Sequence, residues 1–184
     1  MNDITFRVLD KFPEPAHGAL LDEAFSDYEE SALLTELARE ETAARAGEAP
    51  SADDRALRIG AFRGDKLIGW TFANPEGSSV LYMINSGVAP GEQRQGVYSH
   101  LVRMVVEHAR SQGYAVILSR HAADNNAVVI AKLKLGFFVS GFEYSEVYGP
   151  LVRLSYFIGD LRRRLYKRRA TPIRRVRPKA NVGA

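Results

Sequence analysis

Apolar residues recur along this chain with two spacings, the alternation typical of strands and the three-to-four spacing typical of helices. Residues 4–9 alternate as an opening strand, and helical spacing follows over residues 16–27 and 31–46. Residues 47–55 are polar, contain Pro50 and predict a linker. Further strands are predicted over residues 57–62, 67–73, 80–88, 115–119, 137–144 and 151–158, and further helices over residues 92–112 and 124–135.

The order of these elements predicts how the strands pair. Arg63-Gly64-Asp65-Lys66 is a hairpin signal, and the meander that contains it is antiparallel. The strand–helix–strand unit over residues 80–119 instead requires a parallel pair, because a crossover helix returns the chain to the same end of the sheet. The sequence therefore predicts an α/β (α+β) fold with a mixed, mostly antiparallel sheet of six to seven strands flanked by helices.

The composition excludes several classes of protein and several kinds of site. The 184 residues are 46% apolar and 26% charged, as in globular domains. No apolar run approaches the roughly 20 residues of a spanning helix, and the N-terminus lacks a signal-peptide pattern, so we expect a cytoplasmic protein. The absence of cysteine excludes disulfides, thiolate metal sites and a cysteine-bound intermediate. The spacing of the four histidines predicts no metal site.

One segment between the meander and the following helix suits an anion. It reads Val88-Ala89-Pro90-Gly91-Glu92-Gln93-Arg94-Gln95-Gly96-Val97-Tyr98-Ser99. The first turn of a helix presents unpaired N–H groups and a partial positive charge, which suit a diphosphate. Gly96 lets a ligand approach the backbone closely, and Arg94 adds a cation at the rim. The alternative is an ordinary loop with a glycine near a helix start.

A second segment downstream favours the anion site. Residues 125–137 read as a helix that ends in Lys-x-Gly-Phe. In order and spacing, the two segments together resemble the GNAT N-acetyltransferase superfamily. Its Gln/Arg-x-x-Gly-x-Gly/Ala signature matches Gln93 and Gly96, with Tyr98 as a departure. The resemblance covers residues 57–157 and implies the sheet of that family, in which one parallel strand pair splays apart.

The resemblance also implies a cosubstrate, acetyl-CoA. The backbone of the strand end would bind the pantetheine arm, the amides of the loop would hold the diphosphate, and Asn125 would reach the pantetheine. The side chain of Tyr98 would cover the coenzyme or only the helix flank. The cofactor-binding residues implied in this way are Val88, Ala89, Gln93, Arg94, Gln95, Gly96, Val97, Tyr98, Ser99 and Asn125.

The implied reaction is transfer of an acetyl group from acetyl-CoA to a primary amine of a small molecule or a protein, by direct attack. An alkyl amine with a pKa near 10.4 is almost entirely protonated at pH 7, so a base or a water relay must remove its proton. The amide of Val88 or Ala89 could stabilise the developing oxyanion.

Two positions depart from the catalytic pattern of the family. Many members have a general-acid tyrosine four residues before the glycine of Gly-Phe, and here that position is Lys132. Many have a glutamate base midway along the strand before the signature, and here that position is Tyr82. Lys132 could protonate the leaving thiolate or be a solvated helix lysine. Tyr82 could line the acceptor site or only pack.

Three further residues are candidates for binding the acceptor. Glu29 and Glu30 lie between the first two predicted helices, where the family places acceptor-binding residues; the alternative is a solvated acidic turn. His121 follows the predicted strand over residues 115–119. It could act as a base near neutral pH, or it could be a loop histidine without function.

The C-terminal end is strongly basic. From residue 161 onward there are ten basic and no acidic residues, so the preceding residues have 15 basic against 22 acidic side chains. We divide the chain into an acetyltransferase domain over residues 1–160 and a basic tail over residues 161–184. Such a tail binds nucleic acid or anionic lipid, or it only solubilises the protein or docks on its acidic body. Leu161 and Leu165 allow one or two helical turns there.

Two other functions are compatible with the sequence. One is a catalytically weak or inactive acyl-CoA-binding module, and the other is an RNA- or ribosome-associated protein that acts through the tail. A homodimer is compatible with the sequence.

Overall fold

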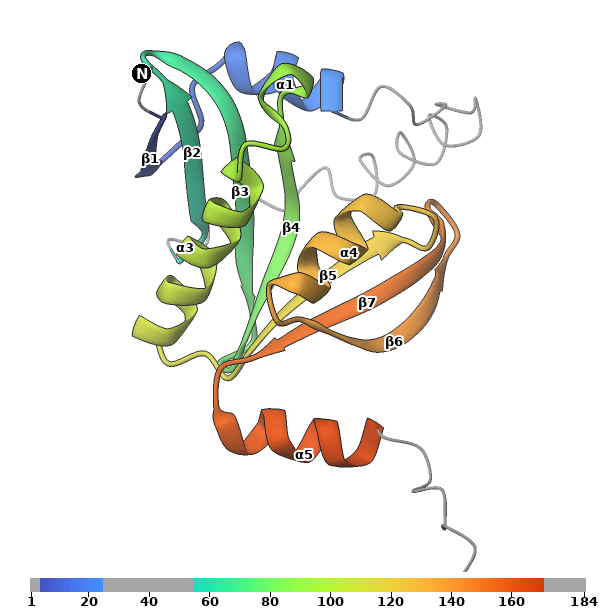
Figure 1. Ribbon diagram of the computed structural model, residues 1–184. Coiled ribbons are helices and arrows are strands. Elements are labelled where there is room, and N and C mark those ends of the chain that lie inside the picture. Colours follow the sequence, from blue (N-terminus) through green and yellow to red (C-terminus); the bar gives the residue numbers. More distant parts are fainter. Residues whose placement is uncertain (1–3, 25–54, 171–184) are drawn as a thin grey trace, which may run out of the picture.

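The computed structural model describes residues 4–24 and 55–170, which form a seven-stranded sheet and its covering helices (Figure 1). The strands are β1 (Ile4–Val8), β2 (Leu57–Arg63), β3 (Lys66–Glu76), β4 (Val80–Val88), β5 (Val116–Ala122), β6 (Phe138–Ser145) and β7 (Gly149–Phe157). The helices are α1 (Ala16–Ala24), the short 3₁₀ helix η1 (Pro90–Glu92), α3 (Val97–Ser111), α4 (Asn126–Lys134) and α5 (Asp160–Ala170).

The sheet confirms the predicted fold class. Its strand order is β1-β2-β3-β4-β5-β7-β6. Every neighbouring pair is antiparallel except β4 and β5, which are parallel and joined by the crossover helix α3. The predicted hairpin between β2 and β3 is also present, with Gly64 at φ 60°. Glycine suits this left-handed conformation because it has no Cβ.

Several boundaries differ from the prediction. The predicted helix over residues 92–112 begins only at Val97, because Arg94 (φ 60°) and Gly96 (φ 82°) adopt left-handed conformations that a helix cannot include. The predicted strand over residues 115–119 continues to Ala122, since the polar residues Arg120 and His121 still pair with β7. The predicted tail forms a helix of three turns, α5, before residue 171.

Some predictions fall outside the described residues. They are the helix over residues 31–46, most of the linker over residues 47–55, the acceptor candidates Glu29 and Glu30, and residues 171–184 of the basic tail.

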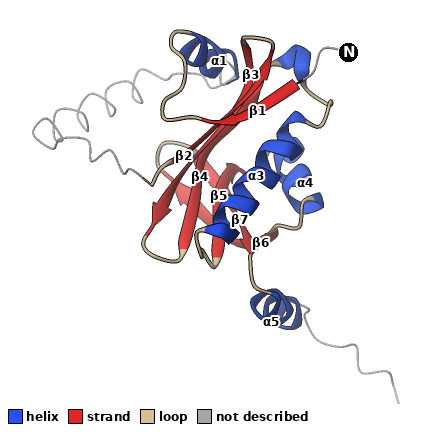
Figure 2. Ribbon diagram, turned by 90° about the vertical axis from the view of Figure 1, so that its left-hand side faces the viewer, coloured by secondary structure: helices blue, strands red, loops and turns tan. Residues whose placement is uncertain are grey.

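Helices cover both faces of the sheet (Figure 2). α3 and α4 lie on one face, where Leu101 and Val105 of α3 are fully buried in the larger apolar core. α1 lies against the other face, where Leu20 packs in a smaller core around Trp70. Coenzyme sites of sheets with a parallel pair tend to lie at the carboxyl ends of the strands, so we expect such a site at the end of β4.

Gly87, near the end of β4, is fitted against the buried Trp70. A Cβ added at this position would overlap the six-membered ring of Trp70, which is fully buried and also donates a hydrogen bond from Nε1 to Asn85 Oδ1 at 2.8 Å. We expect Gly87→Ala to destabilise the fold by about 3 kcal/mol, because the ring has no free space to move into. Urea denaturation measures this change.

Gly91→Ala is the matched control, since a Cβ at Gly91 meets nothing within 4 Å. Equal stability of the two variants would contradict the described packing of Trp70.

Candidate functional site

The loop between β4 and α3 is open on its outer side. A Cβ at Gly96, the residue that precedes the first turn of α3, would meet nothing within 4 Å. Gly96 and Arg94 both have positive φ values, 82° and 60°, so the backbone turns sharply twice within three residues. Turns of this kind gather successive N–H groups into a concave surface that favours anions.

The amides of this loop are free to bind a ligand. Among the described residues, the N–H groups of residues 94–99 have no hydrogen-bond acceptor; the first amide of α3 bonded to the loop is that of His100, which donates to Gly96 O at 3.0 Å. Six neighbouring free amides at a helix N-terminus carry a substantial partial positive charge. The loop can therefore hold a diphosphate, as its sequence predicts.

Side chains from two elements hold the loop in this shape. Arg63, at the end of β2, forms a two-point ion pair with Glu92, with Nε–Oε1 at 3.0 Å and Nη2–Oε2 at 2.5 Å. Arg63 keeps the pKa of Glu92 below its usual value. Gln95 accepts from Arg63 Nη2 at 3.2 Å, and Gln93 Nε2 donates to Val88 O at 3.2 Å. The side chains of Gln93 and Gln95 thus stabilise the loop. The backbone N–H of Gln95 remains available to a ligand, whereas that of Gln93 donates to Pro90 O at 3.4 Å.

β4 and β5 separate beside this loop. Their parallel pairing ends at Met83 and Ser119, although β4 continues to Val88 and β5 to Ala122. A bulge at Ile84 interrupts the register of β4 against β3 at the same point and increases the local twist. The backbone of β4 beyond Met83 is therefore not paired with β5, which leaves an opening in the pairing of the two strands.

Only one of the two predicted strand amides faces this opening. Ala89 N donates to Ile68 O at 2.9 Å, and Ala89 O accepts from Glu92 N at 2.8 Å, so both backbone groups of Ala89 are engaged. Because hydrogen-bonding directions alternate along a strand, the amide of Val88 points to the β5 side. We therefore retain Val88 alone as the backbone donor.

Lys132 of α4 is buried at the point where β4 and β5 separate. Its side chain is 0% exposed, and its Nζ lies 2.8 Å from Met83 Sδ and 4.3 Å from the centre of the Phe137 ring. Neither group is a carboxylate, and none of the ion pairs found among the described residues includes Lys132. The interpretation of Lys132 as a solvated helix lysine is therefore wrong.

Burial lowers the pKa of Lys132 to about 7, because the low-dielectric interior disfavours the ammonium form. An ordinary lysine is fully protonated at neutral pH, whereas this amine exchanges a proton there. Groups whose pKa is shifted toward neutrality by burial are frequent in catalytic sites.

His121 lies near Lys132, and its position differs from the predicted loop. It is part of β5 and not of a loop, and its Nε2 lies 3.1 Å from Ser119 Oγ. Burial, together with the charge of Lys132, lowers the pKa of His121 to about 3. The histidine is therefore neutral at pH 7, and a pKa this low makes it a weaker base than the sequence predicts.

Tyr82 lies on the opposite face of the sheet from Lys132. Its neighbour Met83 faces α4, and successive side chains of a strand point to opposite faces. The guanidinium of Arg120 lies 4.9 Å from the centre of the Tyr82 ring. Hydrogen bonds to Tyr82 and to Glu143 raise the pKa of Arg120. The structure thus does not bring the two catalytic candidates together, and the sheet separates them.

Two other predicted residues have defined roles in the fold. Asn125 caps α4, since its Oδ1 accepts a hydrogen bond from Val128 N at 3.2 Å, which leaves its Nδ2 for a ligand. Tyr98 packs against the larger core, and burial raises its pKa. The Tyr98 hydroxyl is buried and has no hydrogen-bond partner among the residues described. A buried polar atom of this kind requires an explanation.

Sequence reasoning missed two neighbours of Lys132, Met83 and Phe137, and it missed Ser119, which pairs with Met83. Met83 and Ser119 form the last pair between β4 and β5, and Phe137 follows α4. Strand register could have identified the first two, because the resemblance predicts that the parallel pair splays.

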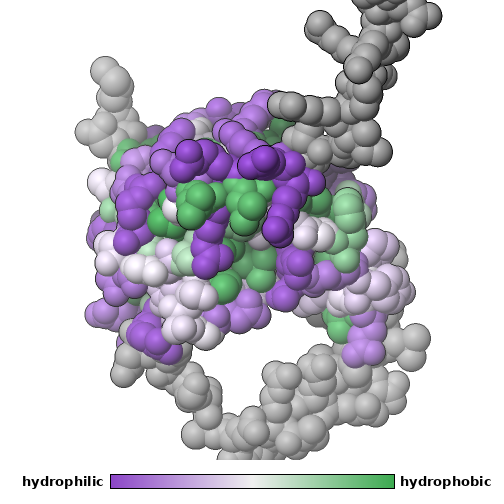
Figure 3. Space-filling model, turned by 90° about the horizontal axis from the view of Figure 1, so that it is seen from below, coloured by the Kyte–Doolittle hydropathy of each residue, from purple (hydrophilic) through white to green (hydrophobic). Residues whose placement is uncertain are grey.

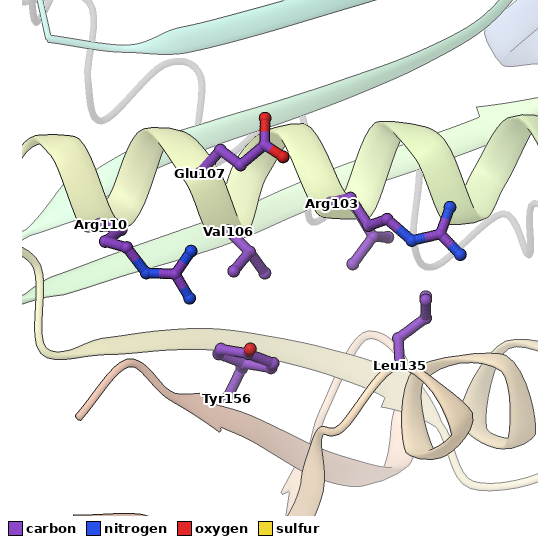
Figure 4. A pocket seen from close by; sticks show the side chains of 7 residues that line it. Arg103, Val106, Glu107, Arg110, Leu135 and Tyr156 are labelled. Atoms are coloured by element: carbon purple, nitrogen blue, oxygen red, sulfur yellow. The ribbon is translucent and has the colours of Figure 1, made fainter. Parts of the chain in front are cut away.

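A separate hollow lies between the C-terminal half of α3 and β7. It has a volume of about 200 Å³ and contains none of the predicted site residues. Figure 4 shows Arg103, Val106 and Arg110 of α3 facing Tyr156 of β7 and Leu135 beyond α4. This hollow lies at the opposite end of α3 from the loop.

The described residues contain neither a membrane-spanning helix nor a metal-binding cluster. No helix there is long and apolar enough to cross a membrane. No group of three or more histidine, aspartate or glutamate side chains in residues 4–24 and 55–170 is arranged to hold a metal ion.

Comparison with known proteins gives one family. The sequence profile described as the acetyltransferase (GNAT) family matches residues 18–137, more than half of the chain. No curated protein matches the chain in sequence.

Solved structures share the fold at low sequence identity. The ribosomal-protein-S18-alanine N-acetyltransferase from Escherichia coli has a TM-score of 0.64 and 19% identity, covering 85% of this chain and 95% of that one. A probable acetyltransferase from Staphylococcus epidermidis has a TM-score of 0.66 and 18% identity, covering 85% and 100%. A putative acetyltransferase from Salmonella typhimurium, solved with its cofactor acetyl-CoA, has a TM-score of 0.61 and 16% identity, covering 86% and 95%.

Proposed function

Because this chain belongs to the GNAT acetyltransferase family, we propose that it transfers an acetyl group from acetyl-CoA to a primary amine by direct attack. The observation that carries the proposal is the separation of β4 and β5 after Met83 and Ser119, with the buried Lys132 at that point and a loop of free amides beside it. The acceptor is a small molecule or a protein amine.

Acetyl-CoA fits the residues present, and it supplies the acetyl group as an activated thioester. The amides of residues 94–99 bind its diphosphate, with the side chain of Arg94 at the rim and the side chains of Gln93 and Gln95 supporting the loop. The amide of Val88 and the free Nδ2 of Asn125 bind the pantetheine arm. The buried hydroxyl of Tyr98, which has no partner among the described residues, would receive a polar partner from the coenzyme.

Lys132 acts as the general acid in this proposal. Nζ carries a proton that can be given to the departing thiolate, and a pKa of about 7 makes that transfer favourable at neutral pH. Met83 and Phe137 surround Nζ with polarisable groups that are not strong hydrogen-bond acceptors, so the proton is not held by a carboxylate. An unpaired buried lysine destabilises the fold, which supports a functional reason for its position.

Tyr82 lies where an acceptor would enter. The coenzyme loop is next to α3, on one face of the sheet, and Tyr82 is on the other. An acceptor that approached from the Tyr82 face would meet the thioester through the opening between β4 and β5. Tyr82 would then contact the acceptor beside the Arg120–Glu143 ion pair, whose Nε–Oε2 distance is 2.8 Å.

Turnover with a panel of amines tests the proposed function. Acetyl-CoA and the full chain are incubated with amino acids, polyamines, aminoglycosides and short peptides, and released thiol is measured. The protein contributes no background because it has no cysteine. We expect amine-dependent thiol release for at least one class. If acetyl-CoA binds but no amine is acetylated, the chain is the inactive acyl-CoA-binding module instead.

A further inference from the structure

α5 is fixed to the sheet by one of its sides. Tyr166 packs on Phe138 and Phe157, with ring centres 4.9 Å and 5.3 Å apart, and its hydroxyl donates to Val139 O. Arg163 Nη2 donates to Phe157 O at 3.0 Å. These contacts set the rotation of the helix about its axis, and they determine which residues point away from the protein.

The outward side of α5 combines leucine with arginine. Leu161 is 73% exposed and Leu165 is 47% exposed, and a spacing of four residues places them one above the other. Figure 3 shows apolar side chains bordered by hydrophilic ones on this face of the molecule. At about 100° per residue, exposed arginines flank the two leucines on both sides: Arg164 and Arg168 on one, Arg162 and Arg169 on the other.

A hollow extends this surface along one flank of the helix. It has a volume of about 470 Å³, with Phe157, Leu165 and Tyr166 as apolar walls and the guanidiniums of Arg162 and Arg169 at its edge. The hollow therefore offers an apolar space and a cationic rim to the same partner. The helix contains one acidic residue, Asp160, which is at its N-terminus and paired with Arg163 at 3.4 Å.

These features match an anionic bilayer surface. A helix that lies in the headgroup region places an apolar stripe among the acyl chains and basic residues against lipid phosphates, and arginine reaches the phosphates while its methylenes stay in apolar surroundings. We propose that α5 is an interfacial helix that binds acidic phospholipid membranes, with Leu161 and Leu165 inserted and the four flanking arginines on the phosphates.

Two other partners fit the surface less well. Single-stranded RNA is bound by stacking bases on exposed aromatic side chains. The one aromatic residue of α5, Tyr166, borders the hollow, but its ring already packs on Phe138 and Phe157. A second copy of α5 packed on the leucines would bring the flanking arginines of both helices together, and like charges in contact oppose association.

Vesicle co-sedimentation of the full chain tests the proposal. Vesicles of phosphatidylcholine alone are compared with vesicles that contain about 30% phosphatidylserine, in about 0.15 M salt. We expect binding to the acidic vesicles only. The double variant Leu161→Gln, Leu165→Gln keeps every charge and should lower the bound fraction at least fivefold. The matched double variant Ile130→Gln, Leu133→Gln, at residues that are 51% and 42% exposed on α4, should leave it unchanged.

Four results would overturn the inference. One is the absence of binding to the acidic vesicles, and the second is binding that the leucine variant leaves intact. The third is a concentration-dependent dimer, seen by light scattering without vesicles, that the same leucine variant abolishes. An oligoribonucleotide that displaces the protein from vesicles while the leucine variant still binds RNA at full strength would assign the surface to nucleic acid.

Discussion

Lys132→Met should lower kcat by about 100-fold at saturating acetyl-CoA and amine, because general acid catalysis contributes at least that factor. Methionine has nearly the volume of lysine and suits the apolar surroundings of Met83 and Phe137, so the loss would come from the missing proton. The affinity for acetyl-CoA should change little. Steady-state turnover and a separate binding titration measure the two quantities.

Two variants control this experiment. Lys134→Met removes an exposed lysine two residues along the same helix and should keep full turnover. Lys132→Tyr supplies a different acid at the same position and should recover part of the turnover that Lys132→Met loses. If Lys132→Met turned over at the wild-type rate, Lys132 would have no catalytic role.

Lys132 should lower the stability of the fold, and it should also make the turnover of the enzyme depend on pH. Burial of an unpaired amine costs stability, so Lys132→Met should raise the free energy of unfolding at pH 7, by about 1–4 kcal/mol. The loss of stability caused by Lys132 is complete below pH 7 and decreases as pH rises toward 10.5, since the folded state then binds fewer protons than the unfolded state.

An acid must be protonated to act, so kcat of the wild type should fall as pH rises above about 7. This decline should be absent from the residual activity of Lys132→Met.

Gly96→Glu should weaken acetyl-CoA binding at least tenfold. The residue has a φ of 82°, which a side chain tolerates poorly, and the open space around its Cβ is where we propose the diphosphate. A carboxylate there opposes a dianion within a few ångströms. The dissociation constant, measured by titration calorimetry, reports the effect.

Two substitutions distinguish the effect of charge on acetyl-CoA binding from the effect of backbone strain. Gly96→Gln has the same size and strain without the charge, so it should weaken binding less than Gly96→Glu. Gly113→Glu adds the same charge at a glycine with a φ of 78° and equally open surroundings at the far end of α3, and it should leave the dissociation constant unchanged. Wild-type affinity in Gly96→Glu would refute the placement of the diphosphate.

The sheet could be predicted from the sequence because the patterns that specify its strands and turns are local. Alternation defined the strands, the glycine at position 64 defined a hairpin, and the crossover over residues 80–119 required a parallel pair. The start of α3 could not be predicted in the same way. Residues 92–96 continue a plausible helical pattern, and the turn depends on two positive φ values and on an ion pair between Glu92 and Arg63, which is distant in sequence.

The environment of Lys132 shows why the site was only partly predictable. In α4 the apolar residues Ile130 and Leu133 are about half exposed, whereas the lysine between them is fully buried. Hydropathy therefore assigns the wrong face of this helix to the core. Only the position of Lys132 in the family motif indicated that it was a catalytic candidate, and its pKa depends on Met83 and Phe137, which only the folded structure brings together.

Titration calorimetry with acetyl-CoA and with S-acetylpantetheine tests most directly whether the free amides of residues 94–99 hold a diphosphate. Both ligands carry the thioester, and only acetyl-CoA carries the diphosphate. The account predicts saturable binding of acetyl-CoA with a dissociation constant between about 1 μM and 1 mM, the usual range of enzyme KM values, and binding of S-acetylpantetheine that is at least 30-fold weaker. Equal affinities for the two ligands, or no heat and no thermal stabilisation with acetyl-CoA, would contradict it.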